Sequence, residues 1–298
     1  LLDEVHALIE DKQLRFVLTG SSARKLRRAG INLLGGRARV LRLHPLVSSE
    51  IGDYDLERIL TFGSLPAIYD SDEPWQDLKA YSGTYLKEEI AAEGAARRLD
   101  AFSRFLHIAA LYSGKQVNFE AWSSDAAVPA RTVREYFSVL SDTLIGEMLE
   151  PWKSGKKRKP ASTGKCYFFD IGVRNALAGI QSIAPGTDEY GNAFEHFIYE
   201  ELRAWLDYNR DDRPLTFWRT QDKKEVDFIV GDEIAIEVKA AELPQHRHLK
   251  GLIAIADEGT FKHRILVCQA PEPRLSEGIE ILPVKAFLEA LWADTLIE

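Results

Sequence analysis

The hydrophobic pattern of the chain is clearest between residues 225 and 240. Apolar residues occupy every second position on both sides of a Gly231-Asp232 pair: Val226, Phe228, Val230, Ile234, Ile236 and Val238. Such alternation is typical of strands with one buried face, and Gly-Asp is typical of a tight turn. The pattern therefore predicts a β-hairpin.

Most other segments show helical spacing. Helices are expected at 1–13, in several pieces across 46–94, in three pieces between 100 and 143, and at 191–206, 245–258 and 284–293. Short apolar runs predict strands at 14–20, 38–46, 146–152, 164–172, 263–268 and 278–283. Alternating helices and strands around the hairpin predict an α/β sandwich for the last third of the chain.

Composition limits the classes of function. The 298 residues carry a net charge of −8, so any nucleic-acid contact must come from a local basic surface. No apolar run approaches the roughly 18 residues that span a bilayer. The two cysteines, Cys166 and Cys268, lie in apolar runs and are expected to be buried free thiols in a reducing cytoplasm. Because residue 1 is Leu and Met148 is the single methionine, we expect the sequence to begin inside a longer protein.

The polar positions of the hairpin suggest metal chemistry. Asp227 lies on the first strand, and Glu237 and Lys239 are two apart on the second, so these last two share one side of the sheet. Mg²⁺ accepts one or two carboxylates together with water and phosphate oxygens. The lysine would then position the attacking water or stabilise charge on the phosphate. The alternative is an exposed hairpin edge with an ordinary Glu–Lys pair.

This pattern resembles the D-x(n)-E-x-K core of restriction-endonuclease-like PD-(D/E)xK nucleases. The resemblance implies a further metal-binding carboxylate on a preceding helix, where Glu195 is the first candidate and Glu200 and Glu201 are the alternatives. It also implies a DNA-contacting glutamine just past the lysine, which Gln245 matches. The implied catalytic residues are Asp227, Glu237, Lys239 and Glu195, with Mg²⁺ held by Asp227, Glu237 and Glu195.

The beginning of the chain resembles the second half of a P-loop domain in prokaryotic AAA-type ATPases that carry a C-terminal domain of unknown function. The motif TGSSARKL carries this resemblance. It implies that Ser21 and Ser22 sense the nucleotide, with Arg37 as an arginine finger and Arg24 as the second choice. An arginine finger also suggests a homo-oligomer. No G-x-x-x-x-G-K-[ST] motif is present, so ATP is expected to bind only in a longer parent chain.

The three helices between 100 and 143 and the two following strands fit the winged-helix plan. Arg131 and Arg134 face outward on the third helix as candidate DNA contacts. The connection between the strands is basic and suits phosphate: Lys153, Lys156, Lys157, Arg158 and Lys159. A solvated edge or a protein-interaction module is the alternative. YFFDIGVRNAL again resembles the ATPase family, and Asp170 within it is expected to cap a helix.

These resemblances predict an α/β multidomain chain with four parts. They are a remnant of the AAA sheet (1–45), a helical lid (46–98), a winged helix (99–180) and a nuclease-like α/β domain (181–298). The expected function is that of an AAA-type ATPase family protein with a DNA-binding winged helix and a metal-dependent, nuclease-like domain. The alternative is a non-cleaving, ATP-dependent switch that binds nucleic acid or a protein partner.

Overall fold

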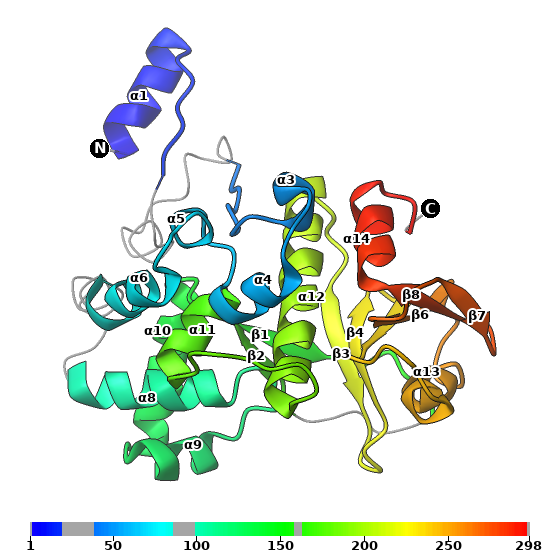
Figure 1. Cartoon of the computed structure of the whole chain (residues 1–298). Coiled ribbons are helices and arrows are strands. Elements are labelled where there is room, and N and C mark those ends of the chain that lie inside the picture. Colours follow the sequence, from blue (N-terminus) through cyan, green and yellow to red (C-terminus); the bar gives the residue numbers. More distant parts are fainter. Residues whose placement is uncertain (1, 20–38, 86–98, 158–162, 297–298) are drawn as a thin grey trace.

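The computed structural model describes residues 2–19, 39–85, 99–157 and 163–296 (Figure 1). It is a mixed α/β structure around one eight-stranded sheet, whose strands lie in the order β2-β1-β3-β4-β5-β6-β8-β7. The strands are β1 (Gly146–Pro151), β2 (Lys165–Phe168), β3 (Leu215–Arg219), β4 (Glu225–Val230), β5 (Ile234–Val238), β6 (His263–Cys268), β7 (Arg274–Ser276) and β8 (Ile279–Pro283). The predicted hairpin is confirmed as β4 and β5.

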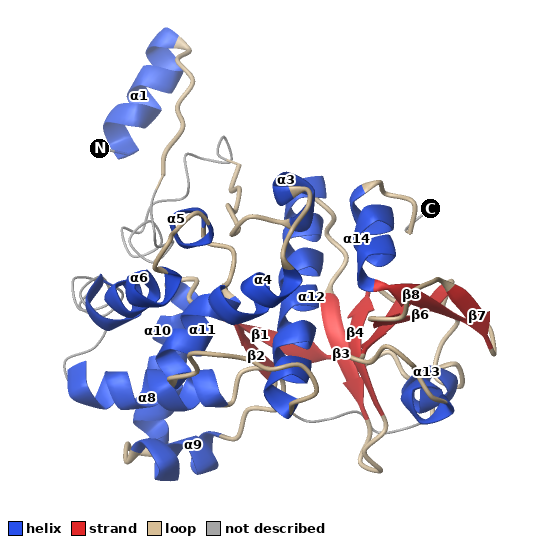
Figure 2. Cartoon of the chain, viewed as in Figure 1, coloured by secondary structure: helices blue, strands red, loops and turns tan. Residues whose placement is uncertain are grey.

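Helices cover both faces of the sheet (Figure 2). The long helix α12 (Asp188–Asn209) and α14 (Val284–Trp292) share one apolar core with the sheet, to which α4 (Leu56–Phe62) also contributes. On the opposite face lie η3 (His246–Leu249) and α13 (Lys250–Ile255), whose core includes Trp218, Ile229 and Leu266. This arrangement is the expected α/β sandwich.

A separate apolar core joins the three helices that precede the sheet. They are α8 (Leu99–Leu111), α9 (Phe119–Ala126) and α10 (Ala130–Asp142), and α11 (Ile171–Ala178) packs with them. Val133, Phe137 and Leu140 are buried on α10, as the helical spacing predicted. The ribbon β1–β2 follows these helices, and β1 also pairs in parallel with β3, so the ribbon extends the main sheet.

The first part of the described chain differs from the expectation. The helix α1 (Leu2–Lys12) is present, but residues 14–19 and 39–46 form no strand. Val17 and Leu43 are 91% and 94% exposed. A strand needs a neighbouring strand for its backbone hydrogen bonds, and none of the described strands lies beside these segments. The short apolar runs were therefore not sufficient to predict strands in residues 14–19 and 39–46.

The residues of the predicted lid form short helices. After α3 (Ser48–Ile51) and α4 come α5 (Pro66–Tyr69), α6 (Pro74–Ala80) and a π-helical turn η2 (Tyr81–Tyr85). Ser48 ties this region to the sandwich, because its backbone N–H and its hydroxyl donate to the buried carboxylate of Glu201 at 2.7 and 2.9 Å. Trp292 also donates to Glu201, at 2.6 Å. Glu201 is thus bound in a structural contact.

Candidate functional site

A change of register between β3 and β4 sets the position of Asp227. Thr216 pairs with Ile229 and Trp218 with Val226, so two residues of β4, Asp227 and Phe228, lie opposite the single residue between them on β3. Such a bulge changes the direction in which a strand's side chains point. Val226 consequently packs in the α13 core while Phe228 packs in the α12 core. The strict alternation expected for this strand is therefore wrong at Val226.

Asp227 lies where the ladder between β4 and β5 ends. The last backbone pair is Phe228 with Ile236, and beyond it the Asp227 carboxylate accepts a hydrogen bond from the Val238 N–H at 2.8 Å. Asp227 is 3% exposed. The carboxylate thus replaces a backbone acceptor, which fixes its position between the two strands.

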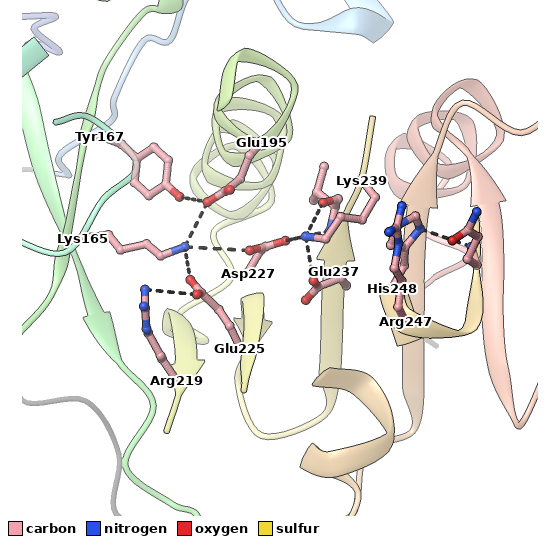
Figure 3. Close-up of polar contacts among 12 residues, drawn as sticks. Lys165, Tyr167, Glu195, Arg219, Glu225, Asp227, Glu237, Lys239, Arg247 and His248 are labelled. Atoms are coloured by element: carbon pink, nitrogen blue, oxygen red, sulfur yellow. Dashed lines mark hydrogen bonds and ion pairs between the residues drawn. The ribbon is translucent and has the colours of Figure 1, made fainter. Parts of the chain in front are cut away.

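Glu237 and Lys239 extend from β5 beside Asp227, as the sequence predicted (Figure 3). The Lys239 ammonium lies 2.7 Å from Glu237 Oε1 and 3.4 Å from Asp227 Oδ2. It also donates to the Val238 carbonyl at 2.9 Å. The side chain of Lys239 is 36% exposed, so this end of the cluster reaches the surface.

Glu195 approaches the same cluster from α12. Its Oε1 accepts hydrogen bonds from the Tyr167 hydroxyl at 2.5 Å and from the Lys165 ammonium at 3.0 Å. Lys165 also lies 2.7 Å from Glu225 and 3.8 Å from Asp227. Arg219 pairs with the other oxygen of Glu225, at 3.2 Å. Four carboxylates and two lysines therefore meet at one place (Figure 3). This group, the Asp227 cluster, consists of Glu195, Glu225, Asp227, Glu237, Lys165 and Lys239.

Burial and neighbouring charge shift the protonation of this cluster. Burial raises the pKa of Glu237 well above its usual range, and Asp227 adds to the rise while Lys239 opposes it. Burial also raises the pKa of Glu195, opposed by Lys165. For Lys165 burial lowers the pKa, but Glu195, Glu225 and Asp227 together outweigh burial and raise it. For Lys239, likewise, burial lowers the pKa but Asp227 and Glu237 outweigh burial and raise it, so both lysines are ammonium ions at neutral pH.

The donor set suits one hard cation. Among the described residues, no three histidine, cysteine or carboxylate side chains are arranged to hold a metal ion. Asp227 and Glu237 nevertheless offer carboxylate oxygens from adjoining strands, and Glu237 Oε2 is buried without a hydrogen-bond partner. Two carboxylates are the number with which proteins commonly bind Mg²⁺. These two residues fit the expected metal once the Lys239 ammonium, which lies between them, moves aside, whereas Glu195 is engaged by the buried Lys165 and by Tyr167.

Three members of the site, Lys165, Tyr167 and Glu225, were not predicted from the sequence. Lys165 begins the run KCYF, in which all four residues are buried, so a lysine inside an apolar strand was the available signal. A buried lysine requires an anionic partner. That signal did not say which carboxylates would be the partners, because they lie 30 to 62 residues further along the chain.

Gln245 stands at the start of η3 and is exposed. Its N–H donates to His248 Nδ1 at 3.2 Å, and His246 pairs with Glu277 at 3.2 Å. The two histidines are thus engaged with different partners.

Three of the candidate nucleic-acid contacts, Arg131, Arg134 and Lys157, lie beside acidic partners. Arg131 pairs with Glu135 at 3.2 Å, and Arg134 pairs with Glu120 at 3.3 Å and lies over the Phe119 ring. On the connection between β1 and β2, Lys153, Lys156 and Lys157 are exposed, and Lys157 lies 3.5 Å from Asp257. The remaining candidates lie outside the described residues: Ser21, Ser22, Arg24, Arg37, Arg158 and Lys159.

Comparisons with known proteins identify two matching families. Residues 190–287 match DUF4143, a domain of unknown function. Residues 53–184 match DUF8612, a second domain of unknown function. The Asp227 cluster therefore lies mainly within the DUF4143 match, while Lys165 and Tyr167 come from the DUF8612 match.

Three curated relatives are similar to the chain, and all are described as uncharacterized proteins. Mb2031c of Mycobacterium bovis and Rv2008c of Mycobacterium tuberculosis are each 27% identical over 240 residues, which cover 77% of this chain and 53% of the relative. A Haemophilus influenzae protein is 24% identical over 306 residues, covering 95% of this chain and 73% of its own length. The chain thus spans about half the length of the mycobacterial relatives. No solved structure matches it.

None of the helices in the described part of the chain has the length and apolar character needed to cross a membrane.

Proposed function

We propose that this chain is part of an AAA-type ATPase family protein, and that its Asp227 cluster is a metal-dependent, nuclease-like site for phosphodiester hydrolysis. The observation that carries the proposal is the arrangement of Asp227, Glu237 and Lys239 on adjoining strands. Two buried carboxylates share one ammonium there, and one carboxylate oxygen has no partner. An Mg²⁺ ion held by Asp227 and Glu237 would supply Lewis-acid activation of water and phosphate.

The protein's own residues would supply positioning and charge. Lys239 is the most exposed of the four carboxylates and two lysines, so its ammonium can hold a water or a phosphate oxygen at the edge of the site. The hydrogen bond from the Val238 N–H holds the Asp227 carboxylate between the two strands. Gln245, Arg131 and Arg134 and the lysines of the ribbon connection would contact the nucleic acid outside the reacting centre.

The ATPase assignment comes from the family match and the motif resemblance together. DUF4143 is often found with AAA ATPases, and TGSSARKL resembles the end of such a domain. Nucleotide binding belongs to the longer parent protein in this proposal, with Arg37 supporting assembly of several copies. Cys166 and Cys268 are buried free thiols, which agrees with a reducing cytoplasm.

Calorimetric titration of Mn²⁺ and Mg²⁺ tests the proposal. The chain should bind the metal, and Asp227→Asn should abolish binding and any Mg²⁺-dependent cleavage of DNA or RNA while the chain remains folded. Asp222→Asn is the matched control, since Asp222 is an exposed aspartate shortly before β4. Equal binding or cleavage by Asp227→Asn and the wild type would rule out the proposed site.

The second candidate function is a non-cleaving switch that binds nucleic acid or a protein partner. One observation favours it: Lys165 and Lys239 already provide cations for the carboxylates, so the cluster does not need a metal to be neutralised. Binding of nucleic acid that is unaffected by metal chelation and is not followed by cleavage would support this function.

A further inference from the structure

Lys165 is a buried cation among three carboxylates. Its side chain is 3% exposed and its ammonium lies 3.0 Å from Glu195, 2.7 Å from Glu225 and 3.8 Å from Asp227. The Phe217 ring lies 5.3 Å from the ammonium. Lys165 comes from β2 at one end of the sheet, and its partners come from α12 and β4. The ammonium thus has the surroundings of a bound cation.

Asp227 divides this cluster into two cation positions. Its Oδ1 faces Lys165, whereas its Oδ2 faces Lys239. The first position has Glu195, Glu225 and Asp227 around Lys165, and the second has Asp227 and Glu237 around Lys239. The two lysines differ in burial, because the side chain of Lys165 is 3% exposed and that of Lys239 is 36% exposed, so a metal can displace only Lys239. Many metal-dependent phosphodiesterases hold two ions about 3.5–4 Å apart in adjoining positions of this kind. Here a lysine fills the first position permanently.

We propose that Lys165 is a built-in substitute for one metal ion, so that the site accepts at most one divalent cation, at the position between Asp227 and Glu237. This inference rests on the proposed function, because it concerns the same cluster. Removal of the ammonium leaves three carboxylates without their shared cation. Such a group of carboxylates, of which Asp227 is buried, takes up protons or another cation, and a divalent metal with oxygen ligands is the chemical class of cation that fits.

The test measures the number of Mn²⁺ ions bound by the wild type, Lys165→Gln and Lys165→Arg, using calorimetry and electron paramagnetic resonance of free Mn²⁺. Lys165→Gln should bind one Mn²⁺ more than the wild type. Lys165→Arg retains a cation and should keep the wild-type number. Lys285→Gln, an exposed lysine of α14, controls for the loss of one positive charge. Equal stoichiometry in Lys165→Gln and the wild type would overturn the proposal.

A stability measurement covers the case in which Lys165→Gln is poorly folded. Melting temperatures are compared in chelator and in Mn²⁺. If the metal replaces the ammonium, Mn²⁺ should raise the melting temperature of Lys165→Gln more than that of the wild type. A variant that stays unfolded in Mn²⁺ as well as in chelator would also contradict the proposal, because the metal then does not substitute for Lys165.

The outcomes separate this inference from the proposed function. A wild type that binds two Mn²⁺ ions leaves the proposed function intact but refutes the substitution by Lys165. A wild type that binds none, with a Lys165→Gln variant that binds one, supports the substitution and argues against metal-dependent hydrolysis by the wild-type chain.

Discussion

The carboxylate of Asp170 accepts a hydrogen bond at 3.0 Å from the backbone N–H of Ser64, which lies 106 residues earlier in the chain. The other carboxylate oxygen accepts from the Val173 N–H at 2.8 Å and so caps α11. The expected capping role is confirmed. Because Ser64 directly follows the C-cap of α4, Asp170 joins the ends of two helices in the interior.

Gly63→Ala should be strongly destabilising. Gly63 has φ +75° and ψ −167°, a conformation that is essentially restricted to glycine, and an added Cβ would lie 2.4 Å from Asp170 Oδ1. Strain and overpacking each cost about 1–3 kcal/mol, so we expect a total loss of about 2–6 kcal/mol in urea unfolding.

Gly179→Ala provides the matched control. Gly179 also ends a helix at φ +75°, but nothing lies within 4 Å of its added Cβ. Its left-handed conformation costs an alanine about 1–2 kcal/mol. Equal losses for the two variants would show that the contact between Gly63 and Asp170 does not constrain the fold.

Asp170 should also make stability depend on pH. Burial raises its pKa to about 6, and backbone N–H groups only partly oppose the rise. Between about pH 4 and pH 6 the folded state keeps a proton on Asp170 that the unfolded state has already lost. The stabilisation that the protonated carboxyl gives is therefore fully present below about pH 4 and is lost as the pH rises through about 6. The wild type should therefore lose up to about 3 kcal/mol of stability relative to Asp170→Asn over this interval, because asparagine does not titrate. Urea unfolding at several pH values measures it, and a constant difference would contradict it.

Two stacked tyrosines allow a comparison inside and outside the cluster. The Tyr167 and Tyr199 rings are 4.2 Å apart, and each hydroxyl donates to a glutamate, Tyr167 to Glu195 and Tyr199 to Glu147. Tyr167→Phe removes a donor from the Glu195 carboxylate, which is 20% exposed, and should cost about 1.5–3 kcal/mol. Tyr199→Phe should cost less, since Glu147 is 39% exposed and also pairs with Arg203. Equal losses in thermal or urea unfolding would argue against a special role for the Tyr167 contact.

Local patterns predicted most of the sandwich. The Gly231-Asp232 turn and the flanking alternation are sufficient for the β4–β5 hairpin, and the spacing of Phe194, Phe197 and Leu202 is sufficient for α12. The pair Glu237 and Lys239 follows from the same alternation. These features depend on neighbours a few residues away, so the sequence contains their causes.

The remaining features depend on distant partners. The bulge at Asp227 arises from the register between β3 and β4, which no single strand determines. The place of Lys165 in the cluster depends on β1 pairing with β3, which brings the ribbon to the main sheet. The predicted strand at 14–20 shows the converse, because strand propensity without a paired neighbour leaves residues 14–19 irregular.

The connection between β1 and β2 is the part of the proposed nucleic-acid surface that can be tested most directly. Lys157 lies near Asp257, and its N–H donates to Glu258 at 2.7 Å, which holds the connection against the end of α13. Lys156 is exposed beside it and should contact phosphate.

Lys156→Glu should weaken binding of a labelled DNA duplex and lower the slope of log affinity against log salt by about 0.9 for the phosphate contact that is lost. Lys79→Glu makes the same charge change on α6 and is the control. Fluorescence anisotropy over a range of KCl concentrations measures both variants. If both lose the same affinity, the effect reflects net charge alone, and the connection is a solvated edge rather than a nucleic-acid contact.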